Sequence, residues 1–506
     1  MPTDVLVELG SKIELFHTPA GAAFADVLID GHRETWAVRS KRLRDWLRRR
    51  YYQATGAAPC LPELRSALDL LEARAQFDAP ERAVHVRLAE HAGRIYLDLA
   101  DARWRAVEVG PDGWQVIGSP PVRFRRSAGM LPLPLPVRGG SIETLGSLLN
   151  LSHRNDFVLV VAWLLATLRS GGPHPLLAVA GEQGSAKTVL SKLLKALIDP
   201  HAAPVRALAR DERELMIAAT HSHLLAFDNL SSLPALLSDA LCRLASGGSL
   251  AVRRLYTDED EMLFQAARPI LLNGIENVVS RADLADRAIF LTLAPIAEQQ
   301  RRSEAELWRE FERARPAILG ALLDAVAHGL RTLPRVRLER LPRMADFAIW
   351  ATACETALWP SGTFVRCYET NRRTSIDDVV DADPVAACVR EIMAERSTWT
   401  GSATDLLRAG ADLTDDGIWR GNAGWPKNPR ALAGRLRRAQ TFLRAVGIDI
   451  AFSREGRAGN RIIRMRATRE NTVGTVSSVR EGGSRSAAGQ PAKQPSSSPI
   501  STMDPV

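Results

Sequence analysis

Apolar and polar residues alternate along much of the first 118 residues, a pattern typical of strands that turn one face to a hydrophobic core. Asp-Gly and Ala-Gly pairs separate the alternating segments, as such pairs do at tight turns. One stretch, RLRDWLRRRYYQATG, repeats its apolar residues at helical spacing instead. We therefore predict a small β-rich domain of α+β type over residues 1–118.

Prolines dominate the next segment, SPPVRFRRSAGMLPLPLPVRGGS, at 119–141. A proline ring fixes φ and lacks a backbone N–H, so this segment cannot form regular helix or sheet. The composition predicts a proline-rich linker or strap at a domain boundary.

Short apolar runs alternate with helical patterns over residues 142–300. The runs LLAVA, HLLAFD, PILLN and AIFLTL have the length of buried strands, and this alternation predicts a parallel sheet covered by helices on both faces. The apolar run FVLVVAWLLATL at 157–168 is too short to cross a bilayer and predicts a buried helix. Residues 301–382 show one helical pattern after another, which predicts a helical lid.

The carboxy-terminal part opens with a helical pattern, DPVAACVREIMAER, and ends with an Arg-rich amphipathic helix followed by two strands. That order is typical of a winged helix, which we predict over residues 383–467. The tail at 468–506 is rich in Ser, Gly and Pro, and its composition predicts disorder.

The composition is that of an ordinary globular protein, with 46% hydrophobic and 25% charged residues in 506. The first residues lack the regions of a signal peptide, so we expect a cytoplasmic protein without a membrane segment. Its cysteines show no metal-binding spacing and are expected to be free thiols: Cys60, Cys242, Cys354, Cys367 and Cys388.

The formal net charge of +8 favours an anionic partner, nucleic acid before membrane. Between Arg420 and Arg466, twelve Lys or Arg stand against two acids. A codon bias toward arginine would spread the basic residues evenly, so this concentration favours a DNA-binding function. A solvated basic face on a protein-docking module is the alternative.

The stretch LLAVAGEQGSAKTVLSKLLKALI at 176–198 combines an apolar strand, a turn with glycines and a helical pattern. Backbone N–H groups of such a turn and the positive end of the helix bind phosphates. Lys187 would reach the β- and γ-phosphate oxygens, and the Thr188 hydroxyl would complete the shell of a magnesium ion. The expected nucleotide-binding residues are Gly181, Glu182, Gln183, Gly184, Ser185, Ala186, Lys187 and Thr188.

Ala186 departs from the phosphate-binding rule G-x-x-x-x-G-K-[ST], which has glycine at this position. If the backbone there needs a positive φ, the Cβ costs on the order of 1 kcal/mol, which a domain of this size tolerates. Nucleotide binding is therefore still expected.

Polar residues end the two apolar runs that follow the turn. Asp228 and Asn229 close HLLAFDNL, and a carboxylate at a strand tip beside a phosphate turn is a ligand for magnesium. Asn273 closes PILLNG, where its amide can orient an attacking water. The alternative is that these residues are turn formers.

Two arginines, Arg281 and Arg287, come just before the last apolar run. An arginine at this place can stabilise charge on the γ-phosphate of a neighbouring subunit in a ring. A surface salt bridge with Asp283 or Asp286 is the alternative reading.

This order of phosphate turn, Asp-ending strand, Asn-ending strand and paired arginines resembles the AAA+ ATPases. The likeness is greatest to the superfamily 3-like helicases and primase-helicases of phages, plasmids and integrative elements. The stretches DNLSSLP, LCRLASGGSLAVRRLY, LLNGIENV and DLADRA carry the resemblance, over roughly 145–372. It implies a P-loop AAA+ sheet, ATP and Mg²⁺ as cofactors, a homo-hexameric ring, single-stranded or forked DNA as partner, and a primase or other replication partner.

The resemblance also implies roles for single residues. These are ATP and magnesium binding by Lys187 and Thr188, metal coordination by Asp228, sensing of the γ-phosphate by Asn273, and an arginine finger at Arg287, with Arg281 second. The segment ASGGSLAVRRLY resembles a pore hairpin whose Arg253 and Arg254 would contact the DNA backbone.

Asn229 departs from the family pattern, which has the glutamate that activates water at this position. An amide can position water but cannot accept its proton, so hydrolysis would be slow or another carboxylate, such as Glu182, would serve.

In the winged-helix-like part, we expect the helix with Arg435, Arg437 and Arg438 to face DNA, and the hairpin with Arg454, Arg457 and Arg461 to follow phosphates.

The first domain offers fewer signals. Its histidines lack metal spacing, and Asp98 and Asp101 stand at i, i+3, which puts them on opposite faces of a strand and argues against a primase centre. Its position suggests a module that docks DNA or a primase partner.

The sequence therefore predicts an ATP-dependent DNA helicase or translocase that acts in replication of a phage or mobile element. Ala186 and Asn229 motivate an alternative, a nucleotide-gated DNA-binding initiator or loader scaffold with weak or no hydrolysis. A monomeric P-loop kinase of small molecules is a third class, which has no use for a basic carboxy-terminal domain.

Overall fold

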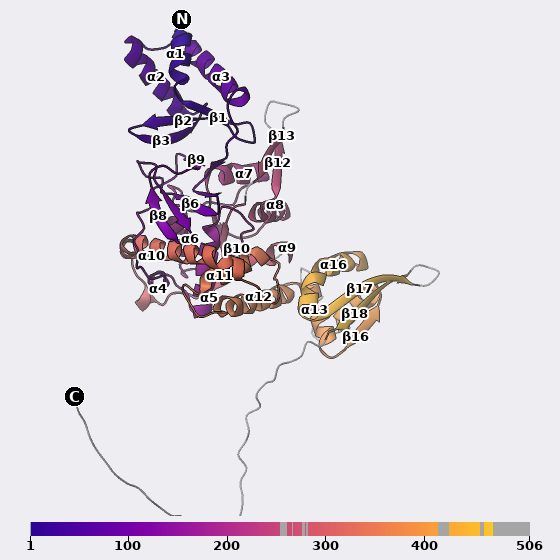
Figure 1. The fold of residues 1–506 in the computed structure, drawn as a ribbon. Helices are drawn as coiled ribbons and strands as arrows, with labels where there is room; N and C mark the ends of the chain where they lie inside the picture. The colour runs from indigo at the N-terminus through magenta and orange to yellow at the C-terminus, as the bar shows by residue number, and fades with distance from the viewer. Residues whose placement is uncertain are drawn as a thin grey trace, which may run out of the picture.

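A computed structural model of the protein describes residues 2–253, 261–265, 267–275, 279, 282–412, 425–455 and 460–468. An amino-terminal unit, a central region and a carboxy-terminal region follow one another in Figure 1. Arg254, Arg281, Arg457 and the predicted tail from 469 onward lie outside the described residues, and Arg253 is described by its backbone alone.

The first unit packs three helices on a small antiparallel sheet of order β1-β2-β3. The predicted helix is confirmed as α2, whereas α1 and α3 were not predicted. In α3, Leu64, Leu68, Leu71 and Ala75 are buried at helical spacing, and Pro62 lies in the first turn, where its missing N–H costs nothing. The elements are α1 (Pro2–Gly10), β1 (Glu14–His17), β2 (Ala23–Ile29), β3 (His32–Ala37), α2 (Lys41–Thr55) and α3 (Leu61–Phe77).

A second antiparallel sheet, of order β5-β6-β7-β8, packs on the central region. Its inward residues Leu97, Val107 and Trp114 share one hydrophobic cluster with helices α5 and α10, and Trp114 Nε1 donates to Asp324 Oδ1 of α10 at 2.8 Å. The strands are β5 (Leu88–His91), β6 (Arg94–Asp98), β7 (Ala106–Gly110) and β8 (Gly113–Ile117), with the short parallel pair β4 (Val84–His85) and β9 (Arg123–Phe124) beside them.

The proline-rich segment is a packed strap. Leu133 is buried and donates its N–H to Leu99 O at 2.9 Å, and Val137 donates to Pro316 O of α10 at 2.9 Å. A Cβ at Gly140 would collide with the carbonyl of Ala317, so the strap lies directly on the helix backbone. The strap therefore ties the second sheet to α10, and the domain boundary at 118 stays a prediction.

The central region confirms the predicted parallel sheet, whose order is β11-β14-β10-β15. Leu177 and Val179 of β10 face the cluster with α5 and α6, whereas Leu176 and Ala178 face the cluster with α7 and α8. The strands are β10 (Leu176–Gly181), β11 (Leu225–Leu230), β14 (Ile270–Gly274) and β15 (Ala288–Leu293). The helices are α4 (Glu143–Gly146), α5 (Arg154–Thr167), α6 (Lys187–Ile198), α7 (Glu212–His221), α8 (Ala235–Ser246) and α9 (Ala282–Ala285).

An antiparallel hairpin, β12 (Ser249–Arg253) with β13 (Glu261–Gln265), projects from the central region after α8 (Figure 1). The predicted buried helix at 157–168 corresponds to α5, whose residues from Phe157 onward are all buried. None of the helices in the described part of the chain is long and apolar enough to cross a membrane.

Helices follow the sheet as predicted: α10 (Glu304–Thr332), α11 (Ala345–Glu355) and α12 (Thr363–Ala382). The last region contains the predicted Arg-rich helix and two strands, and its sheet has the order β16-β18-β17. Its elements are α13 (Pro384–Ala394), β16 (Thr398–Gly401), α14 (Ala403–Asp412), α16 (Pro429–Ala445), β17 (Ile448–Glu455) and β18 (Asn460–Ala467).

A buried charge cluster joins α6 to the second sheet. Asp199, at the end of α6, accepts from Lys195 Nζ at 2.7 Å and from Arg87 Nε at 3.0 Å. The backbone N–H groups of His223 and Leu224 also donate to Asp199, at 2.9 and 3.1 Å. These three charged side chains are at most 2% exposed, so the cluster fixes the end of α6 against strands from both sheets.

Burial shapes the titration of this cluster. Desolvation alone would raise the pKa of Asp199, but Lys195 and Arg87 outweigh it and hold that pKa far below the usual range. Desolvation lowers the pKa of His223 to about 4, so His223 is neutral at pH 7 and its Nε2 donates to Thr167 O at 2.7 Å.

We expect Asp199→Asn to lower the free energy of unfolding by about 3–5 kcal/mol, because it leaves two buried cations without their anion. Urea unfolding followed by tryptophan fluorescence measures the change. Asp449→Asn is the matched control: Asp449 pairs with Arg444 at the surface, and its loss should cost less than about 1 kcal/mol. Equal losses in the two variants would contradict the stabilising role of the cluster.

Candidate nucleotide-binding site

The turn between β10 and α6 lies at the carboxyl end of the parallel sheet, where ligands of such sheets bind. Three of its residues have positive φ: Gly181 at 153°, Gly184 at 84° and Ala186 at 63°. At Gly181 only glycine fits, because a Cβ would lie 2.6 Å from Leu293 O of the neighbouring strand. The turn is therefore a tight one that leads directly into the amino-terminal end of α6.

Ala186 occupies the left-handed region, with φ 63° and ψ 27°, and caps α6. This is the conformation in which glycine is favoured, so the alanine carries the strain that its sequence position predicts. The turn nevertheless forms, and helix α6 begins directly after Ala186.

The first two residues of α6 have different partners: the Lys187 side chain turns back into the turn, and the Thr188 side chain faces Asp228 of β11. Lys187 Nζ donates to Gly181 O at 2.7 Å and to Glu182 O at 2.8 Å, so the ammonium lies inside the turn. Thr188 Oγ1 donates to Asp228 Oδ1 at 3.0 Å. The structure thus brings together the predicted lysine, hydroxyl and carboxylate, while Glu182 and Gln183 stay exposed on the turn.

The two asparagines form a second layer beside the turn. Asn273, 1% exposed, accepts from the Asn229 backbone N–H at 3.0 Å and donates through Nδ2 to Ser191 Oγ of α6 at 2.8 Å. Asn229 has a φ of 58°, a conformation that asparagine tolerates better than most residues. Asn273 therefore links the ends of strands β11 and β14 to helix α6.

Asn150 completes the site and was not predicted. Its Nδ2 donates to Ser185 O at 3.0 Å and to Ala294 O at 2.8 Å, which fixes the turn to the end of β15. An asparagine in a loop carries no sequence signal of such a role, because its partners lie 35 and 144 residues away.

Arg287 lies away from this site. It precedes β15 at the amino end of the sheet, roughly 17 Å from the turn at the rise of a strand. Its Nη1 donates to Asp283 O at 2.5 Å and stands 3.9 Å from the Asp283 carboxylate. The salt bridge named as the alternative is therefore present, and a role in a neighbouring subunit stays a prediction.

A cleft in the last region gathers three of the predicted DNA-binding arginines, Arg437, Arg454 and Arg461. Arg454 and Arg461 are cross-strand partners on β17 and β18, and the Arg437 guanidinium lies 4.6 Å from the centre of the Phe452 ring. The amino-terminal ends of α14 and α16 also line the cleft. Arg430, in the first turn of α16, also lines the cleft, so basic side chains and the helix ends border it together.

The other two predicted arginines of α16 point elsewhere. Arg435 pairs with Asp383 at 2.9 Å, and Arg438 lines a separate pocket with Asp378 and Val379 at the junction with α12.

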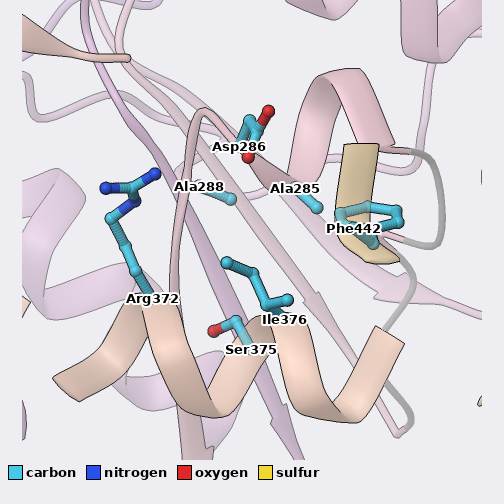
Figure 2. A pocket seen from close by; sticks show the side chains of 7 residues that line it. All are labelled: Ala285, Asp286, Ala288, Arg372, Ser375, Ile376 and Phe442. Carbon is cyan, nitrogen blue, oxygen red and sulfur yellow. The ribbon is translucent and has the colours of Figure 1, made fainter. Parts of the chain in front are cut away.

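Figure 2 shows a second junction pocket, where Phe442 of α16 meets the end of α9, the start of β15 and helix α12. Asp286 and Arg372 lie on two sides of this pocket, which Ala285, Ala288, Ser375 and Ile376 complete. The helix that carries Arg437 thus packs directly on the central region.

The fold is a mixed α/β architecture built on a parallel sheet. Comparisons with known proteins show which families parts of the chain resemble. Residues 142–382 match the family described as "Actinomycete integrative conjugative element replication protein". Residues 385–482 match the "AICE RepA C-terminal domain". Over these residues the chain is similar to replication proteins of conjugative elements.

Solved structures show weaker likeness. "The A form apo structure of NrS-1 C terminal region-CTR" shares 13% identity over 92% of this chain and 99% of that chain, with a TM-score of 0.40. "SCCmec type IV Cch - active helicase" shares 10% identity over 90% and 93%, with a TM-score of 0.45. Neither score defines a shared overall fold, and no curated protein matches the sequence.

We expect Ala186→Gly to raise the free energy of unfolding by about 1 kcal/mol, because glycine removes the Cβ from a left-handed position. Chemical denaturation measures the change. Ala196→Gly, in the interior of α6, is the control and should lower stability by about 1 kcal/mol. Two losses of the same size would show that Ala186 is not strained.

Proposed function

We propose that the protein is an ATPase whose nucleotide lies on the turn between β10 and α6. The observation that carries the proposal is the convergence of Lys187, Thr188 and Asp228 at the carboxyl end of a parallel sheet. The turn and the amino-terminal end of α6 offer backbone N–H groups and a positive dipole to phosphates. Lys187 adds a full positive charge at the same point.

The chemistry of Thr188 and Asp228 fits a magnesium ion, which prefers oxygen ligands. The hydroxyl and carboxylate oxygens lie 3.0 Å apart, and phosphate oxygens and water would supply the other ligands. When bound, such an ion neutralises charge that develops on the phosphates. In the described ranges, this site included, no group of three or more His, Cys, Asp or Glu side chains is arranged to hold a metal.

Hydrolysis depends on the positioning of a water, and the two asparagines bear on it. Asn229 is exposed beside Asp228, and its amide can orient water but cannot take the proton. Glu182 is an exposed carboxylate on the turn that can take that proton. Asn229 is also the observation that favours the second candidate function, a nucleotide-gated initiator or loader scaffold with weak turnover.

We further propose that the ATPase acts on DNA as a helicase or translocase in replication of a conjugative element. The family similarity of residues 142–382 supports a replication role. In a homo-hexameric ring, Arg287 would act on the nucleotide of the neighbouring subunit, because it lies too far from the turn of its own chain. The hairpin β12–β13 with Arg253 would face the DNA.

The last region, which we propose to be winged-helix-like, would bind DNA through its cleft. Arg437, Arg454 and Arg461 can contact phosphates along the backbone, where such contacts position DNA without reading its sequence. The helix amino-terminal ends that line the cleft add favourable dipoles.

ATP turnover with and without single-stranded DNA tests the proposal. We expect Lys187→Ala to abolish ATP binding while DNA binding through residues 420–466 persists. Asp228→Ala and Arg287→Ala should each lower DNA-stimulated turnover at least a hundredfold, because they remove a metal ligand and an arginine finger.

Mixing the two inactive proteins Lys187→Ala and Arg287→Ala tests the ring. Turnover should partly return, because some subunit interfaces then combine an intact Lys187 with an intact Arg287. ATP binding without turnover in the wild type would favour the scaffold, and a monomer with ATP would contradict both.

For the carboxy-terminal cleft, we expect Arg437→Glu to weaken DNA binding at least tenfold and to reduce its salt dependence. Fluorescence anisotropy at several salt concentrations measures both. Arg444→Glu is a control on the same helix, since Arg444 pairs with Asp449 and does not line the cleft. Equal effects of the two variants would show that only net charge matters.

A further inference from the structure

The amino-terminal unit precedes both matched families, and its charges are unevenly placed. Residues 2–78 carry eleven Lys or Arg and eleven Asp or Glu, so the unit is neutral in total. Helix α2, in contrast, has six basic residues and the single acid Asp45. The basic residues are Lys41, Arg42, Arg44, Arg48, Arg49 and Arg50.

The local sequence explains why this face of α2 points outward. Ser40 caps the helix by accepting the Leu43 N–H at 3.2 Å, and Gly56 ends it in the left-handed conformation. Leu43, Leu47 and Tyr51 are buried at a spacing of four residues and dock the helix on the unit. Most of the remaining residues are left on the solvent side, whereas Trp46 packs partly against the same core.

Some basic side chains near this helix are paired with carboxylates. Arg39 pairs with Asp69 at 2.6 Å, and Arg82, which follows the unit, pairs with Glu14 at 2.5 Å. On α2 itself, Arg42 pairs with Glu34 at 2.7 Å and Arg48 stands 3.8 Å from Asp45.

Four cations of α2 remain without a carboxylate. Across the described part of the chain, no acidic side chain forms an ion pair with Lys41, Arg44, Arg49 or Arg50. Four uncompensated charges on one helix raise the local potential and favour a polyanion.

Aromatic side chains lie among these cations. Tyr52 is 61% exposed and follows Arg48 and Arg49 by four and three residues, so the three share one face of the helix. The Arg50 guanidinium lies 5.4 Å from the centre of the Trp46 ring. Cations that track a backbone, next to an exposed ring on which a base can stack, are the combination that binds single-stranded nucleic acid.

We propose that the exposed face of α2, formed by Lys41, Arg44, Arg48, Arg49 and Tyr52, is a binding surface for single-stranded DNA. The inference rests on the proposed DNA-directed function and gives the amino-terminal unit a partner. Helix α2 and the elements α16, β17 and β18 that border the carboxy-terminal cleft lie far apart in Figure 1, so the two surfaces would contact separate stretches of DNA. An exposed tyrosine on this face distinguishes a single strand, whose bases are free to stack, from a duplex.

The test uses the full chain and a labelled oligothymidylate in fluorescence anisotropy, without ATP. The double variant Arg44→Glu, Arg49→Glu should bind at least tenfold more weakly. The slope of log K against log salt should fall by about 1.4, for two lost contacts to a single strand. Tyr52→Ala should weaken binding about tenfold.

The matched control is Lys12→Glu with Arg65→Glu, which makes the same change in charge on the same unit, outside α2. Both residues are exposed, and this variant should bind within twofold of the wild type. Thermal unfolding of each variant confirms that the unit stays folded.

Binding by the α2 variant equal to that of the control would overturn the proposal. So would an equal loss on a duplex of the same length, which would show that the surface does not select single strands. A loss in Arg437→Glu with none in the α2 variant would keep the proposed function and reject only this surface. A wild type that binds no DNA at all would reject the proposed function itself.

Discussion

Asp199 holds two cations in an interior without solvent, and the position of the candidate site follows from that arrangement. Lys195 comes from the same helix, whereas Arg87 arrives from a part of the chain 112 residues earlier. Burying three charges is tolerable only when every partner is in place, so the cluster permits one placement of α6. The first turn of the same helix carries Lys187 and Thr188. Helix α6 is therefore held at its carboxyl end by the charge cluster and at Ser191 by Asn273, while Asn150 fixes the turn that precedes it.

Local patterns in the sequence were sufficient for the elements that build this site. Strand β10, its turn and helix α6 follow one another without a gap, so glycine spacing and apolar runs predicted them. The positive φ of Ala186 followed from its place in the motif. The parallel sheet followed from alternating strands and helices, because parallel strands need such crossovers. The assignment of roles to Asp228, Asn273 and Arg287 remains a prediction.

Interactions between distant segments could not be predicted in this way. Arg435 was expected to face DNA, but Asp383, 52 residues earlier, holds it at the junction with α13. Helix α2, in contrast, was predicted, because its apolar residues recur at helical spacing among basic ones. Helix α3 was not predicted, although its buried positions have ordinary helical spacing. Its capping box forms around Cys60, an unusual cap residue, so the start of the helix lacked the usual sequence signal. The packing of the second sheet on α10 depends on side chains such as Trp114 and Asp324, which no local pattern connects.

The strap has a consequence for how the chain can be divided. The Val137 N–H of the strap donates to the Pro316 carbonyl, in the interior of α10. Helix-interior carbonyls normally do not accept from a segment outside the helix, and Gly140 and Gly320 leave the space that this close contact needs. A fragment that begins at residue 142, where the family match begins, would lose the strap and the sheet β5–β8 together. It would present the apolar side of α10 to water, and we would expect such a truncated protein to aggregate. The smallest fragment that keeps the strap and the sheet β5–β8 therefore begins near residue 84.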